Sequence, residues 1–103
     1  MMDELVAKFL PRFAALAHER MRRAVDCASS RKHELAADIA HDLHSLAGEA
    51  GLLGLEGVTT RARSAEEAAR RFGDTRKEDD ANGLGECLVN LERALADAMA
   101  NRP

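Results

Sequence analysis

A chain of 103 residues with a net charge of −3 and neither tryptophan nor tyrosine is long enough for one domain, which we place at residues 1–103. The slightly acidic balance and the missing stacking aromatics argue against a nucleic-acid-binding protein. No run approaches the roughly 20 apolar residues that cross a bilayer, and the acidic start lacks the basic region of a signal peptide, so we expect a cytoplasmic protein without membrane contact.

The predicted elements are all helical, because apolar residues recur at spacings of three and four and no segment alternates with a period of two. A short amphipathic segment over 2–10 precedes Pro11, and proline is tolerated only near the start of a helix. We therefore expect a short N-terminal helix and a separate helix from Arg12 to about Ser29. The apolar positions of this second helix are Phe13, Leu16, Ala17, Met21, Ala24 and Ala28.

Three further segments follow. The third runs over 31–53, and Gly54 has the position of a glycine that ends a helix. The fourth runs over 55–73. A charged connector, either a solvated loop or a frayed helix start, covers 75–80, and a leucine-rich helix closes the chain. The apolar stripes are Leu35, Ile39, Leu43, Leu46, Ala50 and Leu53 in the third, Leu55, Val58, Ala62, Ala65, Ala69 and Phe72 in the fourth, and Leu84, Leu88, Leu91, Leu95 and Met99 in the last.

Short links between helices favour antiparallel neighbours. The sequence therefore predicts an all-α fold, an antiparallel up-down four-helix bundle with an additional short N-terminal helix. Apolar stripes of ordinary width predict a monomer. The two cysteines, Cys27 and Cys87, lack the spacing of a redox or metal-binding pair, and we expect both as reduced thiols.

The run His44-Ser-Leu-Ala-Gly-Glu-Ala-Gly-Leu-Leu-Gly54 places three glycines and two alanines after one histidine. Each glycine costs about 0.8–1 kcal/mol relative to alanine inside a helix, so a compensating role is expected. At about 100° per residue, His44 points roughly 150° away from the centre of the core stripe and faces solvent. The sector beside it contains Ala37, Ala40, His41, Ala47, Gly48 and Gly51.

Spacing alone leaves two interpretations of this sector. An imidazole on a nearly bare surface suits a histidine that enters another protein's pocket, with Gly48 clearing the space one turn away. Alternatively, the alanines and glycines let a neighbouring helix approach closely, and His44 is an ordinary surface residue. A neutral imidazole is a usable nucleophile at cellular pH, whereas no GxxxxGK[ST] loop is present to take phosphate from ATP.

The run from His44 to Gly54 resembles the signature of histidine-containing phosphotransfer (HPt) domains, roughly His-x-Leu-Lys-Gly-x-Ala-x-x-x-Gly. His44, Leu46, Gly48, Ala50 and Gly54 fall in register with it. The resemblance implies a four-helix bundle with an exposed histidine in mid-helix. It also implies a carrier, not an enzyme, in a two-component phosphorelay that passes phosphoryl groups between aspartates of receiver domains.

Carried over by position, His44 is the phosphorylated residue. The expected partners are response-regulator receiver domains, a hybrid histidine kinase, or both. We expect no cofactor and no metal in this chain, with Mg²⁺ supplied by the partner receiver domain. The expected docking and clearance residues are Ala37, Ala40, His41, Ala47, Gly48, Gly51 and Leu52.

One position departs from the HPt signature. The lysine three residues after the histidine is replaced by Ala47, and a cation from a neighbouring helix, Arg61 or Arg63, is the expected substitute. His41 is a rival acceptor, because His41-Asp-Leu-His-Ser-Leu46 resembles the H-box of sensor kinases. That resemblance lacks the proline, since Leu46 stands there, and the arginine, since His44 stands there.

Two other functions are considered. The chain is an interaction module without chemistry if it docks a signalling partner through the Ala/Gly face around His44. It holds a metal if His41 and His44, three residues apart, share an ion with His33 or His18. The second idea is weakened because no Glu-x-x-His pair recurs on a second helix, as di-metal bundles require.

Overall fold

The computed structural model describes the backbone of residues 2–100 and the side chains of that range except those of residues 2, 3 and 5. Four α-helices make up nearly all of it, and the described range contains no β-strand. The predicted all-helical class is therefore confirmed. The helices are α1 (Met2–Ser29), α2 (Ala36–Leu52), α3 (Glu56–Thr75) and α4 (Glu78–Ala100), and the short 3-10 helix η1 (His33–Leu35) leads into α2.

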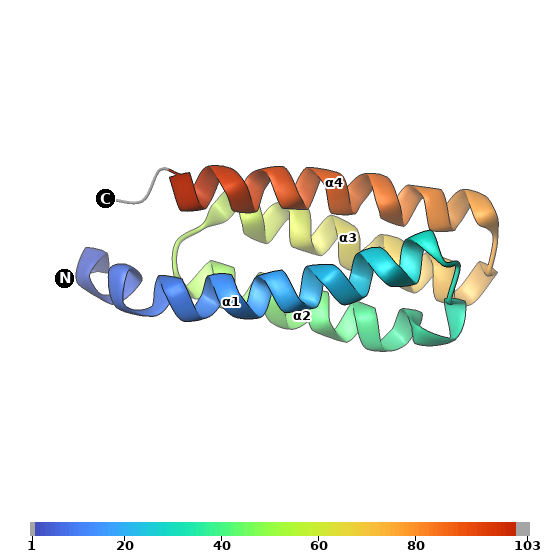
Figure 1. Cartoon of the computed structure of the whole chain (residues 1–103), viewed down its shortest axis with the longest axis horizontal. Helices are drawn as coiled ribbons and strands as arrows, with labels where there is room; N and C mark the ends of the chain where they lie inside the picture. The colour runs from blue at the N-terminus through green and yellow to red at the C-terminus, as the bar shows by residue number, and fades with distance from the viewer. Residues whose placement is uncertain (1, 101–103) are drawn as a thin grey trace.

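The four helices lie side by side in an elongated bundle, which measures 45 × 19 × 18 Å along its principal axes (Figure 1). Helix α3 packs closely against both α2 and α4, and α1 completes the bundle through looser contacts with α2 and α4. Two ion pairs support the α1–α2 contact: Arg20 Nη1 lies 2.7 Å from Glu49 Oε1, and Arg23 Nη2 lies 2.9 Å from Asp42 Oδ2. None of the described helices is both long and apolar enough to span a membrane.

The first helix differs from the prediction. We expected a short helix over 2–10 and a new helix after Pro11, but α1 is continuous across Pro11. Proline removes one backbone hydrogen bond and crowds the carbonyl four residues earlier, and the ribbon of α1 changes direction near its N-terminal end (Figure 1). Helix contacts on both sides of the proline offset this loss, because Leu10 is 2% and Phe13 is 4% exposed.

Helix α2 begins at Ala36, later than the start at Arg31 that was predicted for this segment. Arg31 has a positive φ of 51°, so the chain turns there before η1 forms. The thiol of Cys27 donates to the carbonyl of Lys32 across this turn, with an S–O distance of 3.3 Å. Because the spacing of a 3-10 turn differs from that of an α-helix, Leu35 is rotated out of the predicted stripe and is 39% exposed.

The end of α2 is the predicted glycine stop. Gly54 has a φ of +74°, a left-handed conformation that glycine adopts without a Cβ penalty. The amide of Gly54 donates to the carbonyl of Gly51 at 3.1 Å, and the amide of Leu55 donates to the carbonyl of Ala50 at 2.9 Å. These two bonds form a Schellman motif, so the prediction for Gly54 is confirmed.

One prediction about the second half was wrong, because α3 continues through Gly73 to Thr75. The charged stretch over 75–80 contains the end of α3, a short link and the start of α4 at Glu78. A Cβ on Gly73 would lie only 3.1 Å from the Cβ of Ala36, so this glycine permits the close approach of α2 and α3. The acidic residues that open α4 complement the positive end of the helix dipole; they are Glu78, Asp79 and Asp80.

The hydrophobic core runs the length of the bundle and receives residues from all four helices. Leucines and two phenylalanines are among its largest side chains, whereas α3 contributes mainly alanines, which allow its neighbours to pack closely. The largest fully buried side chains include Phe72, Leu10, Leu43, Leu46, Leu84, Leu88 and Leu91.

Candidate functional site

His44 lies in the middle of α2 with 70% of its side chain exposed. Its Nδ1 atom is 3.2 Å from Oε1 of Glu66 on α3. A carboxylate can only accept a hydrogen bond, so this contact assigns the ring proton of neutral His44 to Nδ1. The opposite nitrogen, Nε2, then carries the free lone pair, and the exposure of the ring makes that atom accessible from solvent.

Glu66 is the residue that links His44 to a cation. Its side chain is only 14% exposed, and its second oxygen, Oε2, accepts hydrogen bonds from Arg70 Nη2 at 2.7 Å and from Arg70 Nε at 3.2 Å. Burial acts to raise the pKa of Glu66, but the hydrogen bonds from Arg70 and His44 outweigh it, and the pKa lies below its usual value. Glu66 is therefore an anion at neutral pH.

Close packing of α2 against α3 explains why the glutamate reaches the imidazole. The stripe of α2 that starts at Ala36 extends to Gly51, where an added Cβ would lie 3.8 Å from Oγ1 of Thr59 on α3. Ala40 and Ala47 occupy this stripe at helical spacing and are 0% and 3% exposed. Because both are small, the two helix backbones lie close enough for a single glutamate to span the gap.

The expected bare face is thus smaller than the spacing predicted. Ala40 and Ala47 belong to the buried contact between helices and cannot form part of an exposed docking surface. The remaining expected residues stay at the surface, and Leu52 is 81% exposed. These exposed residues are Ala37, His41, Gly48, Gly51 and Leu52.

Gly48 lies one helical turn beyond His44 and is exposed. A Cβ added there would meet no atom within 4 Å, so no neighbour inside the chain requires glycine at this position. The helix nevertheless bears the cost of glycine, which is about 1 kcal/mol relative to alanine. A surface that must accept an approaching molecule beside His44 would account for it.

The cation near His44 differs from the two we expected. Arg61 lines a groove formed by α1, α3 and α4, and Arg63 is exposed on α3 without a recorded bond to His44 or Glu66. Arg70 is the arginine that shares a carboxylate with His44, and neither Arg70 nor Glu66 was among the residues predicted from the sequence. The available signal was the pair Glu66 and Arg70 at i, i+4, a spacing that favours an ion pair on a helix.

His33 and the two cysteines make contacts other than those that join His44 to Glu66. The ring of His33 packs edge-on against Phe72, with centroids 6.5 Å apart. Cys27 and Cys87 are free thiols, and burial raises the pKa of each. Within the described residues, no group of three or more histidine, cysteine, aspartate or glutamate side chains is arranged to hold a metal ion.

Comparison with family models, with curated proteins and with solved structures found no match to this chain. The class of protein must therefore be inferred from the run between His44 and Gly54 and from the geometry around His44. That geometry consists of an exposed imidazole, a partly buried carboxylate that fixes its tautomer, and an arginine that balances the carboxylate.

Proposed function

We propose that this protein is a histidine phosphocarrier of the HPt type, which accepts a phosphoryl group on Nε2 of His44 from the phosphoaspartate of a receiver domain and returns it to another. The observation that carries the proposal is the hydrogen bond between His44 Nδ1 and Glu66 on an otherwise exposed ring. It leaves one nitrogen protonated and oriented, and the other free to react.

The transfer requires no general base in this chain. The lone pair of His44 Nε2 forms a bond to phosphorus while the bond from phosphorus to the aspartate oxygen breaks, and the aspartate leaves as a carboxylate. The proton stays on Nδ1 throughout, so the phosphorylated ring carries a positive charge. The anionic carboxylate of Glu66, 3.2 Å from that nitrogen, stabilises this positive charge. The ring becomes neutral again when the phosphoryl group leaves Nε2 for the next aspartate.

Arg70 has a separate part in this proposal. A bare carboxylate beside the imidazole would repel the incoming phosphoryl group, and the guanidinium on Oε2 of Glu66 offsets that negative charge. Arg70 thereby supplies the local cation that the HPt signature places at the position of Ala47. Mg²⁺ and the remaining charge stabilisation would come from the partner receiver domain.

The surroundings of His44 suit docking to another protein. Small or short side chains beside the ring keep the surface low, and Leu52 adds an exposed apolar contact at the end of α2. We further propose that the four helices run alternately up and down, because the links between them are only a few residues long. The carrier is proposed to act in the cytoplasm as a monomer, without enzymatic activity of its own.

Incubation with a phosphorylated receiver domain tests the proposal. The full chain should gain a single acid-labile, base-stable phosphate, and His44→Gln should abolish the gain while circular dichroism shows an intact helical fold. His41→Gln, on the neighbouring exposed turn, is the matched control and should retain transfer. Full transfer to His44→Gln would refute the assignment, and its loss in His41→Gln alone would move the acceptor to His41.

A non-catalytic interaction module is the alternative function, and the same variants separate it from a carrier. A module that only docks would capture the partner through the face around His44 without ever becoming phosphorylated. Retention of partner binding by His44→Gln, combined with no phosphate on the wild-type chain from any receiver domain tested, would favour the module.

A further inference from the structure

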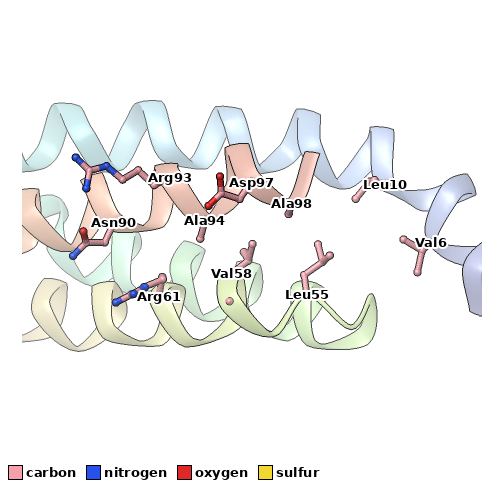
Figure 2. Close-up of a pocket in the computed structure, with 11 residues that line it drawn as sticks. Val6, Leu10, Leu55, Val58, Arg61, Asn90, Arg93, Ala94, Asp97 and Ala98 are labelled. Atoms are coloured by element: carbon pink, nitrogen blue, oxygen red, sulfur yellow. The ribbon is translucent and has the colours of Figure 1, made fainter. Parts of the chain in front are cut away.

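A groove lies where α1, α3 and α4 meet, toward the end of the bundle that holds the start of α3 (Figure 2). Its volume is about 610 Å³, which falls within the range of small-molecule sites in proteins. No residue of α2 lines it, so the groove is separate from the face that carries His44.

The two ends of the groove differ in chemistry. One end is apolar, with Leu10 and Val58 forming a buried floor at 2% and 1% exposure and with Val6 and Leu55 beside them. Along α4 this lining continues with Ala94 and Ala98, and Asp97 lies between them. Figure 2 shows that Val6 and Leu10 lie at the opposite end of the groove from the polar groups described next.

The other end is cationic. Arg61 from α3 and Arg93 from α4 extend their guanidinium groups toward the same end, where the side-chain amide of Asn90 also lies (Figure 2). Neither arginine forms an ion pair with any residue whose side chain the structure describes, although Asp97 follows Arg93 by one helical turn. Two guanidiniums from different helices thus lie at one end of the groove, and the carboxylate of Asp97 lies farther along α4, between them and the apolar end (Figure 2).

We propose that this groove binds a free medium-chain fatty acid, with its alkyl chain on the apolar floor and its carboxylate between Arg61 and Arg93. Guanidinium groups pair with carboxylates through two parallel hydrogen bonds, and Asn90 can donate a third. The groove follows α4 from Asn90 to Ala98, which is about 12 Å at the helical rise of 1.5 Å per residue. That length suits a ten-carbon chain in an extended form.

The arrangement also discriminates against other ligands. A cationic amphiphile would place its charge against two arginines, and a neutral alcohol would leave both guanidiniums without a partner. A small, fully polar anion would satisfy the arginines but leave the floor formed by Leu10 and Val58 exposed to water. An anionic head on an alkyl chain meets both requirements.

Nuclear magnetic resonance on the ¹⁵N-labelled full chain tests this site. Titration with decanoate below its micelle concentration should give saturable amide shifts around 55–61 and 90–98 and leave the amide of His44 unmoved. Decanol and decyltrimethylammonium, which share the alkyl chain, should bind at least about tenfold more weakly, since each loses the charged hydrogen bonds.

Three variants sharpen the test. The double variant Arg61→Gln/Arg93→Gln should weaken decanoate binding roughly 10- to 100-fold, whereas Arg63→Gln, an exposed arginine on α3 outside the groove, should leave it unchanged. Gly57→Leu should block binding by filling the groove, because Gly57 lines it and an added Cβ there would meet no atom within 4 Å. Thermal unfolding checks that each variant remains folded.

Some outcomes would overturn the proposal. Equal affinity for decanoate and decyltrimethylammonium would show that the arginines do not select an anion. Unchanged binding by the double arginine variant, or shifts that map to other helices, would place the ligand elsewhere. Sedimentation with phosphatidylglycerol vesicles without any binding of monomeric decanoate would assign the arginines to a lipid surface instead of a free fatty acid.

Discussion

Replacement of Glu66 by glutamine tests the central physical claim of the phosphocarrier proposal. Glutamine keeps the shape of the side chain, and its carbonyl can still accept the hydrogen bond from His44 Nδ1. The substitution removes the negative charge and replaces Oε2, the acceptor of Arg70, by an amide nitrogen that can only donate. Any change in transfer rate therefore reports the loss of the Glu66 charge together with its pairing to Arg70, while the acceptor that orients the ring is retained.

The expected magnitude follows from the distance. Two unit charges 3.2 Å apart interact by roughly 1.3 kcal/mol at the dielectric constant of water. The water value is the appropriate one, since the His44 side chain is 70% exposed and solvent screens the pair. Phosphorylation develops a positive charge on the ring, and Arg70 offsets part of the charge of Glu66, so Glu66→Gln should slow the forward transfer by up to about tenfold.

A single-turnover assay with a phosphorylated receiver domain measures this rate. Glu66→Ala should be slower still, because the ring then loses its orienting acceptor and can place its proton on Nε2, the proposed nucleophile. The ¹⁵N chemical shifts of the imidazole should report a protonated Nδ1 in the wild type and in Glu66→Gln, and a mixture of tautomers in Glu66→Ala. Wild-type transfer rates in both variants would refute the role of Glu66.

Three further predictions concern stability and docking. Gly48→Ala should raise the free energy of unfolding by up to about 1 kcal/mol in a urea titration, because an added Cβ meets no atom within 4 Å. The same variant should slow phosphoryl transfer from a receiver domain, and faster transfer would contradict the proposal that Gly48 clears space beside His44. Gly54→Ala should destabilise the fold by about 1 kcal/mol, seen as a lower melting temperature, because its φ of +74° disfavours a side chain. The hydrogen bonds from Arg70 and His44 hold the pKa of Glu66 below its usual value of about 4.5 and therefore stabilise the fold above that pH. The free energy of unfolding of the wild type should exceed that of Glu66→Gln by its full amount at pH 7, and this difference should disappear as the pH falls through the lowered pKa. A difference that grew on acidification would contradict this sign.

Hydrophobic spacing predicted the helices well wherever tertiary contacts agreed with local preference. The stripe from Val58 to Phe72 is buried as expected, and Gly54 ends α2 in the predicted conformation. Two of the errors fell at Pro11 and Gly73, where a residue that disfavours helix lies inside one. In both cases packing overrides local propensity: buried neighbours hold α1 together across the proline, and the close approach of Ala36 favours glycine in α3.

The candidate site could be predicted only in part, because its members come from two helices. The position of His44 on the exposed side of α2 followed from the helical period alone. The partner carboxylate of Glu66 could not be predicted in this way, because the helical period of α3 does not indicate which of its residues faces the imidazole. The spacing also could not tell that Ala40 and Ala47 are buried while Gly48 is open, because all three lie within one sector of the helix.

The burial of Ala47 bears on how this chain could work without the lysine of the HPt signature. A lysine at this position would start from a backbone that is packed against α3, where the alanine side chain is 3% exposed. Alanine permits the closer helix contact, and that contact brings Glu66 within 3.2 Å of His44. A carboxylate so close needs a counter-charge, which Arg70 provides from the next turn of α3. Under the phosphocarrier proposal, the cation near His44 is thus Arg70 on α3, which is held there by Glu66 and takes the place of a lysine on α2.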